Sequence, residues 1–227
     1  MNFEIKYNPT HSMALAHLEA GESVRAEAAA MVGMTGNISV ATTARHDGGF
    51  LGGLKRAALG GESFFQNTFT AASSPGHVAL APKLCGSMVT VPLSGGQELF
   101  IQGSSYVAAP ESISLDTKFQ GMKGFFSGES LFFLKASGQG EVLVNAFGAI
   151  EEYELDGELV VDTGHLVAFS SGIEYSISKA SHGWISSFLS GEGLVLRMVG
   201  RGKLYLQSRN PSEYGKNIGH RLPPRQR

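Results

Sequence analysis

The sequence predicts an all-β protein built from three copies of one strand-and-hairpin unit. Thirty glycines and eight prolines in 227 residues indicate frequent turns. The stretches between these turns are short and rich in Val, Ile, Leu and Phe, a pattern typical of sandwiches, barrels and prisms. Similar strings of residues also recur along the chain, which indicates an internal repeat.

The clearest repeat joins two segments of the chain without a gap. Residues 98–109 align with residues 158–169, an offset of 60 (158 − 98), and the preceding turns at 93–96 and 155–157 also correspond. A weaker third copy runs from Leu18 to Met34. We therefore interpret the alanine-rich stretch Ser23 to Met34 as strand, because tertiary context commonly overrides helix propensity.

A second motif, Gly-Glu followed by a strand, a glycine turn and another strand, also occurs three times. The motifs begin at Gly61, Gly128 and Gly191, and the turn glycines are Gly76, Gly140 and Gly202. Because one unit could not bury both faces of its sheet, we expect three units packed around a pseudo-threefold axis. This predicts a single β domain, residues 1–210, with repeats of about 10–90, 91–152 and 153–210, and a basic, proline-containing tail, residues 211–227.

The remaining segments add one helix and a cellular location. Residues Met1 to Tyr7 alternate like a strand, and Phe50 to Leu59 has apolar positions at helical spacing, which predicts one short helix near 50–59. The start of the chain does not resemble a signal peptide, and no apolar run is long enough to span a membrane. With a single cysteine, Cys85, these features favour the cytoplasm.

Several of these strings resemble one protein family. They are residues 48–56, Gly61 to Phe65, the run from Gly128 through Gly140, and Val161 to Phe169. The chain is similar over residues 21–209 to the mitochondrial-biogenesis family named "altered inheritance of mitochondria, twenty-four", and resembles its bacterial type. The resemblance implies the fold of the tryptophan RNA-binding attenuator protein, a β-roll or prism, and formation of homo-oligomers. It supplies no catalytic residues.

The sequence contains only weak candidates for catalytic or ligand-binding sites. The seven histidines lack zinc-ligand spacing, and the nearest metal or small-molecule site is Asp162 with His165; the alternative is a β-turn over Asp162 to Gly164. Cys85 fits a half-buried strand position better than a reactive one. Gly200 to Lys203 lacks phosphate-loop spacing and fits a hairpin turn. We expect no enzymatic activity, no cofactor and no metal.

Basic residues gather near the C-terminus. Arg197, Arg201, Lys203 and Arg209 accompany Tyr205, and four more basic residues follow. Such a surface could contact phosphates, or it could be solvated and followed by a partly disordered tail. Because the whole chain has a net charge of −2, nothing attracts it globally to nucleic acid, and nucleic-acid binding is the lesser alternative.

Large apolar residues precede each Gly-Glu motif and could form a surface patch. Under threefold packing the three loops are equivalent, so they either gather at one end to contact a partner or a membrane, or fold inward as core plugs. The sequence thus favours a non-enzymatic scaffold or binding protein acting through these loops. The candidate residues are Phe50, Leu51, Leu54, Lys55 and Arg56 in the first loop, Met122, Phe125 and Phe126 in the second, and Trp184, Ile185 and Phe188 in the third.

Overall fold

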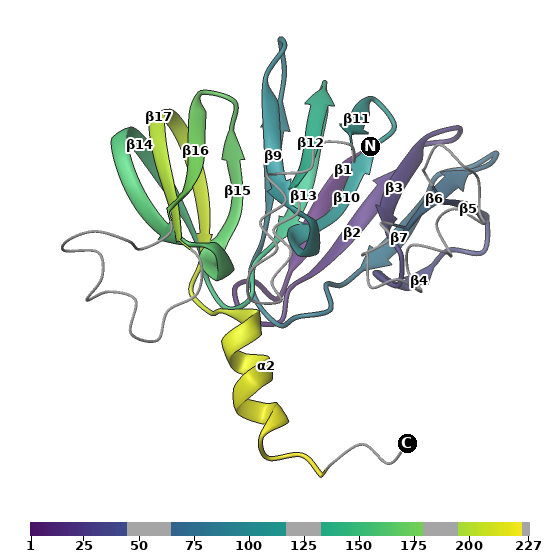
Figure 1. Cartoon of the computed structure of the whole chain (residues 1–227). Helices are drawn as coiled ribbons and strands as arrows, with labels where there is room; N and C mark the ends of the chain where they lie inside the picture. The colour runs from purple at the N-terminus through teal and green to yellow at the C-terminus, as the bar shows by residue number, and fades with distance from the viewer. Residues whose placement is uncertain (45–64, 117–132, 179–194, 224–227) are drawn as a thin grey trace.

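Strands dominate the computed structural model, which describes residues 1–44, 65–116, 133–178 and 195–223 (Figure 1). The all-β class is therefore confirmed, and Ser23 to Met34 contains two strands rather than a helix. The predicted helix near 50–59 lies outside the described residues. The strands are β1 (Asn2–Lys6), β2 (Met13–Leu18), β3 (Ser23–Glu27), β4 (Met31–Met34), β5 (Ile38–Ala44), β6 (Phe65–Ala71), β7 (Gly76–Leu80), β8 (Met88–Leu93), β9 (Glu98–Gln102), β10 (Tyr106–Pro110), β11 (Ile113–Asp116), β12 (Phe133–Gly138), β13 (Gly140–Asn145), β14 (Ile150–Asp162), β15 (Leu166–Ser170), β16 (Ile173–Ser178) and β17 (Val195–Gln207).

Three sheets form a fan in Figure 1, and every strand pair in them is antiparallel. The first sheet has the order β1-β2-β7-β4, and the second has the order β5-β6-β3-β10-β13-β8. The third has the order β11-β12-β9-β15-β17-β14, with β16 also paired to β17. Short 3₁₀ turns, η1 (Gly103–Ser105) and η2 (Thr163–His165), lead into β10 and β15.

The same ladder register occurs three times among the described strands. Ser23 faces Thr70, Glu98 faces Ser137 and Glu158 faces Val199. The first residues of these pairs are offset by 75 (98 − 23) and then by 60 (158 − 98), and their partners by 67 (137 − 70) and then by 62 (199 − 137). A bulge recurs at the matching position of β4, β10 and β15. Whether a triplicated sequence unit underlies this recurrence stays a prediction.

The predicted pseudo-threefold packing is not confirmed. The strands from β2 onward fall into three sets, β2–β7, β8–β13 and β14–β17. Strand β10 pairs with β3, so the second set joins the first, and β15 pairs with β9, so the third set joins the second. No ladder between the described strands joins the third set back to the first. The three sets therefore form an open row, which ends at β4 on one side and at the C-terminal half of β14 on the other.

The predicted turns at 155–157 and at Gly200 to Lys203 are wrong. Residues 150–162 and 195–207 instead form two continuous strands, β14 and β17, paired along their whole length. Gly157, Gly200 and Gly202 have φ values of +126°, +138° and +159° inside these strands. Glycine tolerates this backbone region, so these positions bend the strands without ending them.

Among the described residues, the core consists of three apolar clusters, one associated with each set of ladders. Ile38, Ile113 and Ile173 occupy equivalent positions in them and are 6%, 0% and 4% exposed. A polar contact lies where β10 of the second set meets β3 of the first, because the buried Tyr106 hydroxyl donates to the Arg25 carbonyl oxygen at 2.9 Å. Burial raises the pKa of Tyr106.

Helix α2 (Pro211–Gly219) is the only α-helix among the described residues, and it projects away from the strands (Figure 1). None of its residues is buried. No described helix has the length and apolar character needed to cross a bilayer. The predicted tail thus begins with an ordered element at the end of β17.

Candidate functional site

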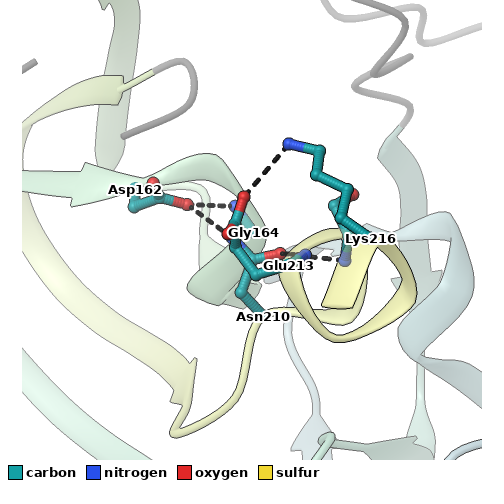
Figure 2. A network of polar contacts seen from close by, with 6 residues as sticks. Asp162, Gly164, Asn210, Glu213 and Lys216 are labelled. Atoms are coloured by element: carbon teal, nitrogen blue, oxygen red, sulfur yellow. Dashed lines mark hydrogen bonds and ion pairs between the residues drawn. The ribbon is translucent and has the colours of Figure 1, made fainter. Parts of the chain in front are cut away.

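The junction between η2 and α2 contains the Asp162 constellation singled out in the sequence. Asp162 Oδ1 accepts hydrogen bonds from the Gly164 backbone N–H at 2.7 Å and from Asn210 Nδ2 at 3.3 Å. Asn210 Oδ1 in turn accepts from the backbone N–H groups of Ser212 and Glu213, at 2.9 and 3.2 Å (Figure 2). Asn210 therefore caps α2, and one side chain ties the helix to the preceding turn.

Close packing holds this junction together. A Cβ atom added at Gly164 would lie 2.2 Å from Asn210 Nδ2 and 2.4 Å from Asn210 Cγ. Real Cβ atoms are not found at such distances, so position 164 is restricted by its neighbour. The glycine is required by contact with Asn210.

His165 serves the fold at this junction. Its Nδ1 lies 2.7 Å from the carbonyl oxygen of Gln207, and because a carbonyl can only accept, Nδ1 carries the hydrogen. The Gln207 side chain donates to the Gly164 carbonyl oxygen at 2.7 Å and accepts from Phe147 N at 2.8 Å. These contacts join β17 to two loops distant in sequence.

The Asp162 and His165 pair therefore forms a structural corner, with its turn where the sequence predicted one. Within the described residues no group of three His, Cys, Asp or Glu side chains is arranged to hold a metal ion. Asp162 Oδ2 and Thr163 Oγ1 are buried without a hydrogen-bond partner. Those two oxygens offer acceptor capacity, but too few ligands converge here for a divalent cation.

A surface pocket of about 620 Å³ opens between α2 and the end of β17. On one side Phe147 and Tyr214 stack edge to face with ring centroids 5.1 Å apart. Three side chains that can carry positive charge, Arg209, Lys216 and His220, also line it, and Lys216 forms an ion pair with Glu213 at 3.0 Å. The pocket thus combines an aromatic wall with a mainly basic rim.

The basic residues of β17 are neutralised by acidic residues of β14. Arg197 makes a bidentate ion pair with Glu158 at 2.5 and 2.6 Å, and Arg201 pairs with Asp156 at 2.6 Å. The Arg197 hydrogen bond lowers the pKa of Glu158. Lys203 contacts Glu152, whose hydrogen bond raises the pKa of the lysine. The face expected to attract phosphates therefore carries alternating charges, which does not favour nucleic acid.

Sequence reasoning missed an exposed apolar stripe on α2 and on the turn that follows it. Tyr214, Ile218 and Leu222 are 53%, 38% and 62% exposed. Within α2, the spacing of four residues places Tyr214 and Ile218 on one side of the helix, and Leu222 lies in the turn that follows the helix. The signals were available, because Asn210 and Pro211 are a typical cap and first helical residue.

The apolar loop residues proposed from the sequence lie outside the described residues. This applies to all eleven candidates in the ranges 50–56, 122–126 and 184–188. The glutamates of the three Gly-Glu motifs, Glu62, Glu129 and Glu192, also lie outside. Whether the three apolar loops form a surface patch or fold inward as core plugs stays a prediction.

A family model described as "Mitochondrial biogenesis AIM24" matches residues 3–209. The chain belongs to the mitochondrial biogenesis AIM24 family. It is 30% identical over 230 residues to an uncharacterised protein of Streptococcus pyogenes serotype M6, covering 98% of this chain and 92% of that protein. A crystal structure of a Streptococcus pyogenes protein has a TM-score of 0.79 and 29% identity, covering 97% of this chain and 99% of that one. The AIM24 family resemblance expected from the sequence is thus confirmed.

Proposed function

We propose that this protein is a non-enzymatic scaffold that docks on an anionic membrane surface through α2. The proposal rests on the exposed stripe of α2 and its following turn, where Ile218 and Leu222 extend beyond the contact between Tyr214 and Phe147. Apolar side chains gathered on one helix face are stabilised when another apolar phase covers them. The helix projects from the strands, so its stripe can reach such a phase.

The charge of the same segment favours an anionic lipid surface as that phase. Residues 211–227 contain one acidic residue, Glu213, and four basic ones, Lys216, Arg221, Arg225 and Arg227, which gives +3. Since the whole chain carries −2, residues 1–210 carry −5 (−2 − 3). Basic charge beside an apolar helix stripe is the chemistry of interfacial helices. The acidic remainder would orient the molecule with α2 toward the lipid.

The experiment is co-flotation of the full chain with vesicles of phosphatidylcholine alone or mixed with phosphatidylserine. We expect binding only to the mixed vesicles, weakening as salt is raised. The double variant Ile218→Ser, Leu222→Ser should reduce the bound fraction several-fold. Val199→Ser is the matched control, because Val199 is 41% exposed on β17, close to the 38% of Ile218.

Three outcomes would contradict this proposal. Equal flotation of the double variant and the wild type would show that α2 is not the docking element. If binding were instead lost in the variant Leu54→Ser, Phe125→Ser, Trp184→Ser with its fold retained, the apolar loops would carry the docking. No flotation of any form with either vesicle would overturn membrane docking altogether.

Four finer expectations accompany the proposal. The resemblance implies a bacterial type of protein with an attenuator-like fold and a homo-oligomeric state. The prediction of a half-buried strand position for Cys85 is wrong, because Cys85 is exposed and lies outside the strands. We also propose a cytoplasmic location, because this exposed free thiol would suit a reducing compartment.

A further inference from the structure

Two strand edges of the described chain lack a ladder partner that their counterparts in the other strand sets have. Strand β4 pairs only with β7, whereas its counterparts β10 and β15 each pair with a second strand as well. The C-terminal half of β14 pairs only with β17, whereas its counterparts β3 and β9 are paired on both sides. An unpaired edge leaves backbone N–H and C=O groups available to another strand.

The two edges match each other in register. At the first junction, between β10 and β3, Ala108 faces Ala26. At the second junction, between β15 and β9, Ala168 faces Ile101. The offsets of 75 and 60 make Gly33 the counterpart of Ala108 and Ala168, and Val161 the counterpart of Ala26 and Ile101. A third junction in the same register would place Gly33 opposite Val161 and Met34 opposite Val160.

Exposed apolar side chains gather at these same edges. Met31, Val32 and Met34 of β4 are 43%, 60% and 40% exposed, and Val160 of β14 is 44% exposed. Edge strands that remain unpaired usually carry lysine, proline or inward-pointing charge, and β4 has none of these. The apolar residues indicate an edge that another strand covers.

We propose that β4 of one molecule pairs antiparallel with residues 159–161 of β14 in a second copy of this chain. Gly33 then lies opposite Val161, Met34 opposite Val160 and Thr35 opposite Leu159. The occupant is a second copy because each edge continues the ladder pattern of the other. The contact is head-to-tail, and each added copy presents the same two edges again. This inference is independent of membrane docking by α2.

The test uses paired cysteines in a Cys85→Ser background. Met34→Cys and Val160→Cys are made in separate chains, which are mixed and oxidised. Residues directly opposite in antiparallel strands lie about 4.5–5.5 Å apart at Cα, within reach of a disulfide. We expect disulfide-linked dimers on a non-reducing gel from the mixture and none from either chain alone.

The control and the opposing outcomes are well separated. Val32→Cys mixed with Val160→Cys should cross-link far less, because two residues along a strand add about 6.6 Å. Dimers from one chain alone would show a like-to-like contact and overturn the head-to-tail register. In a chain carrying both substitutions, an intrachain disulfide would show closure within one molecule, and monomers by light scattering would also overturn the proposal.

Discussion

Tyr205 shows how one buried residue links the fold to pH. Its side chain is 4% exposed on β17, where the third strand set meets the second, and it belongs to the same apolar cluster as Tyr106. Burial raises the pKa of Tyr205 to about 12, and the nearby Glu152 carboxylate adds to the shift. In the unfolded chain a tyrosine ionises near pH 10.

We therefore expect the free energy of unfolding to fall as pH rises from about 10 to about 12. In that window the folded state holds the Tyr205 proton and the unfolded state does not, so deprotonation favours unfolding. Denaturant titrations at several alkaline pH values measure the slope. Tyr205→Phe should make the slope shallower without abolishing it, because burial also raises the pKa of Tyr106. An unchanged slope in that variant would assign the effect to other groups.

At the residue scale, the sequence predicted local chemistry better than long-range contacts. The turn over Asp162 to Gly164 is confirmed, because a short Asx-type turn is set by adjacent residues. The partners of that turn, Gln207 and Asn210, lie more than 40 residues away. Nothing in a single sequence indicates that pairing, so His165 remained an ambiguous candidate.

Strand β17 shows the same limit at the element scale. Two glycines in a basic stretch indicate a hairpin turn, yet Gly200 and Gly202 lie within one strand opposite β14. Whether such glycines form a turn or lie within a strand depends on the backbone that packs beside them. A Cβ on Gly200 would lie 2.3 Å from the carbonyl oxygen of Gly172, so the turn that precedes β16 leaves no room for a side chain at position 200.

Gly200→Ala is therefore expected to destabilise the protein strongly, by about 2–4 kcal/mol, through both its positive φ and this backbone contact. Gly157→Ala is the matched control. It has a φ of +126°, but nothing lies within 4 Å of an added Cβ. That variant should lose less, about 1–3 kcal/mol, from its positive φ alone. Chemical denaturation measures both, and equal losses would contradict a role for the close approach.

On the scale of the whole molecule, the all-β class and the AIM24 family membership could be predicted, but the arrangement of the ladders could not. Alternating apolar residues and frequent turns determine the class. Threefold closure requires the outer edges to meet, and β4 and β14 do not pair in the described chain. The repeat offsets of 75 and 60 residues could have predicted that Ile38, Ile113 and Ile173 occupy equivalent core positions.

The division of the chain near residue 210 can be tested by truncation. A chain ending at Arg209 loses α2, which has no buried residue, together with the aromatic contact between Tyr214 and Phe147. We expect the β body to remain folded, with the free energy of unfolding lower by no more than about 1 kcal/mol. Circular dichroism with thermal unfolding measures this. Loss of cooperative unfolding would show that α2 belongs to the domain.

The contact between Gly164 and Asn210 also restricts how this corner can vary among relatives. A side chain at position 164 becomes acceptable only after position 210 has been replaced by a smaller residue, since Asn210 fills that space. A smaller residue at 210 that lacks a side-chain acceptor also weakens the cap of α2. The two positions should therefore change in a fixed order, and relatives with a larger residue at 164 are expected to begin this helix differently.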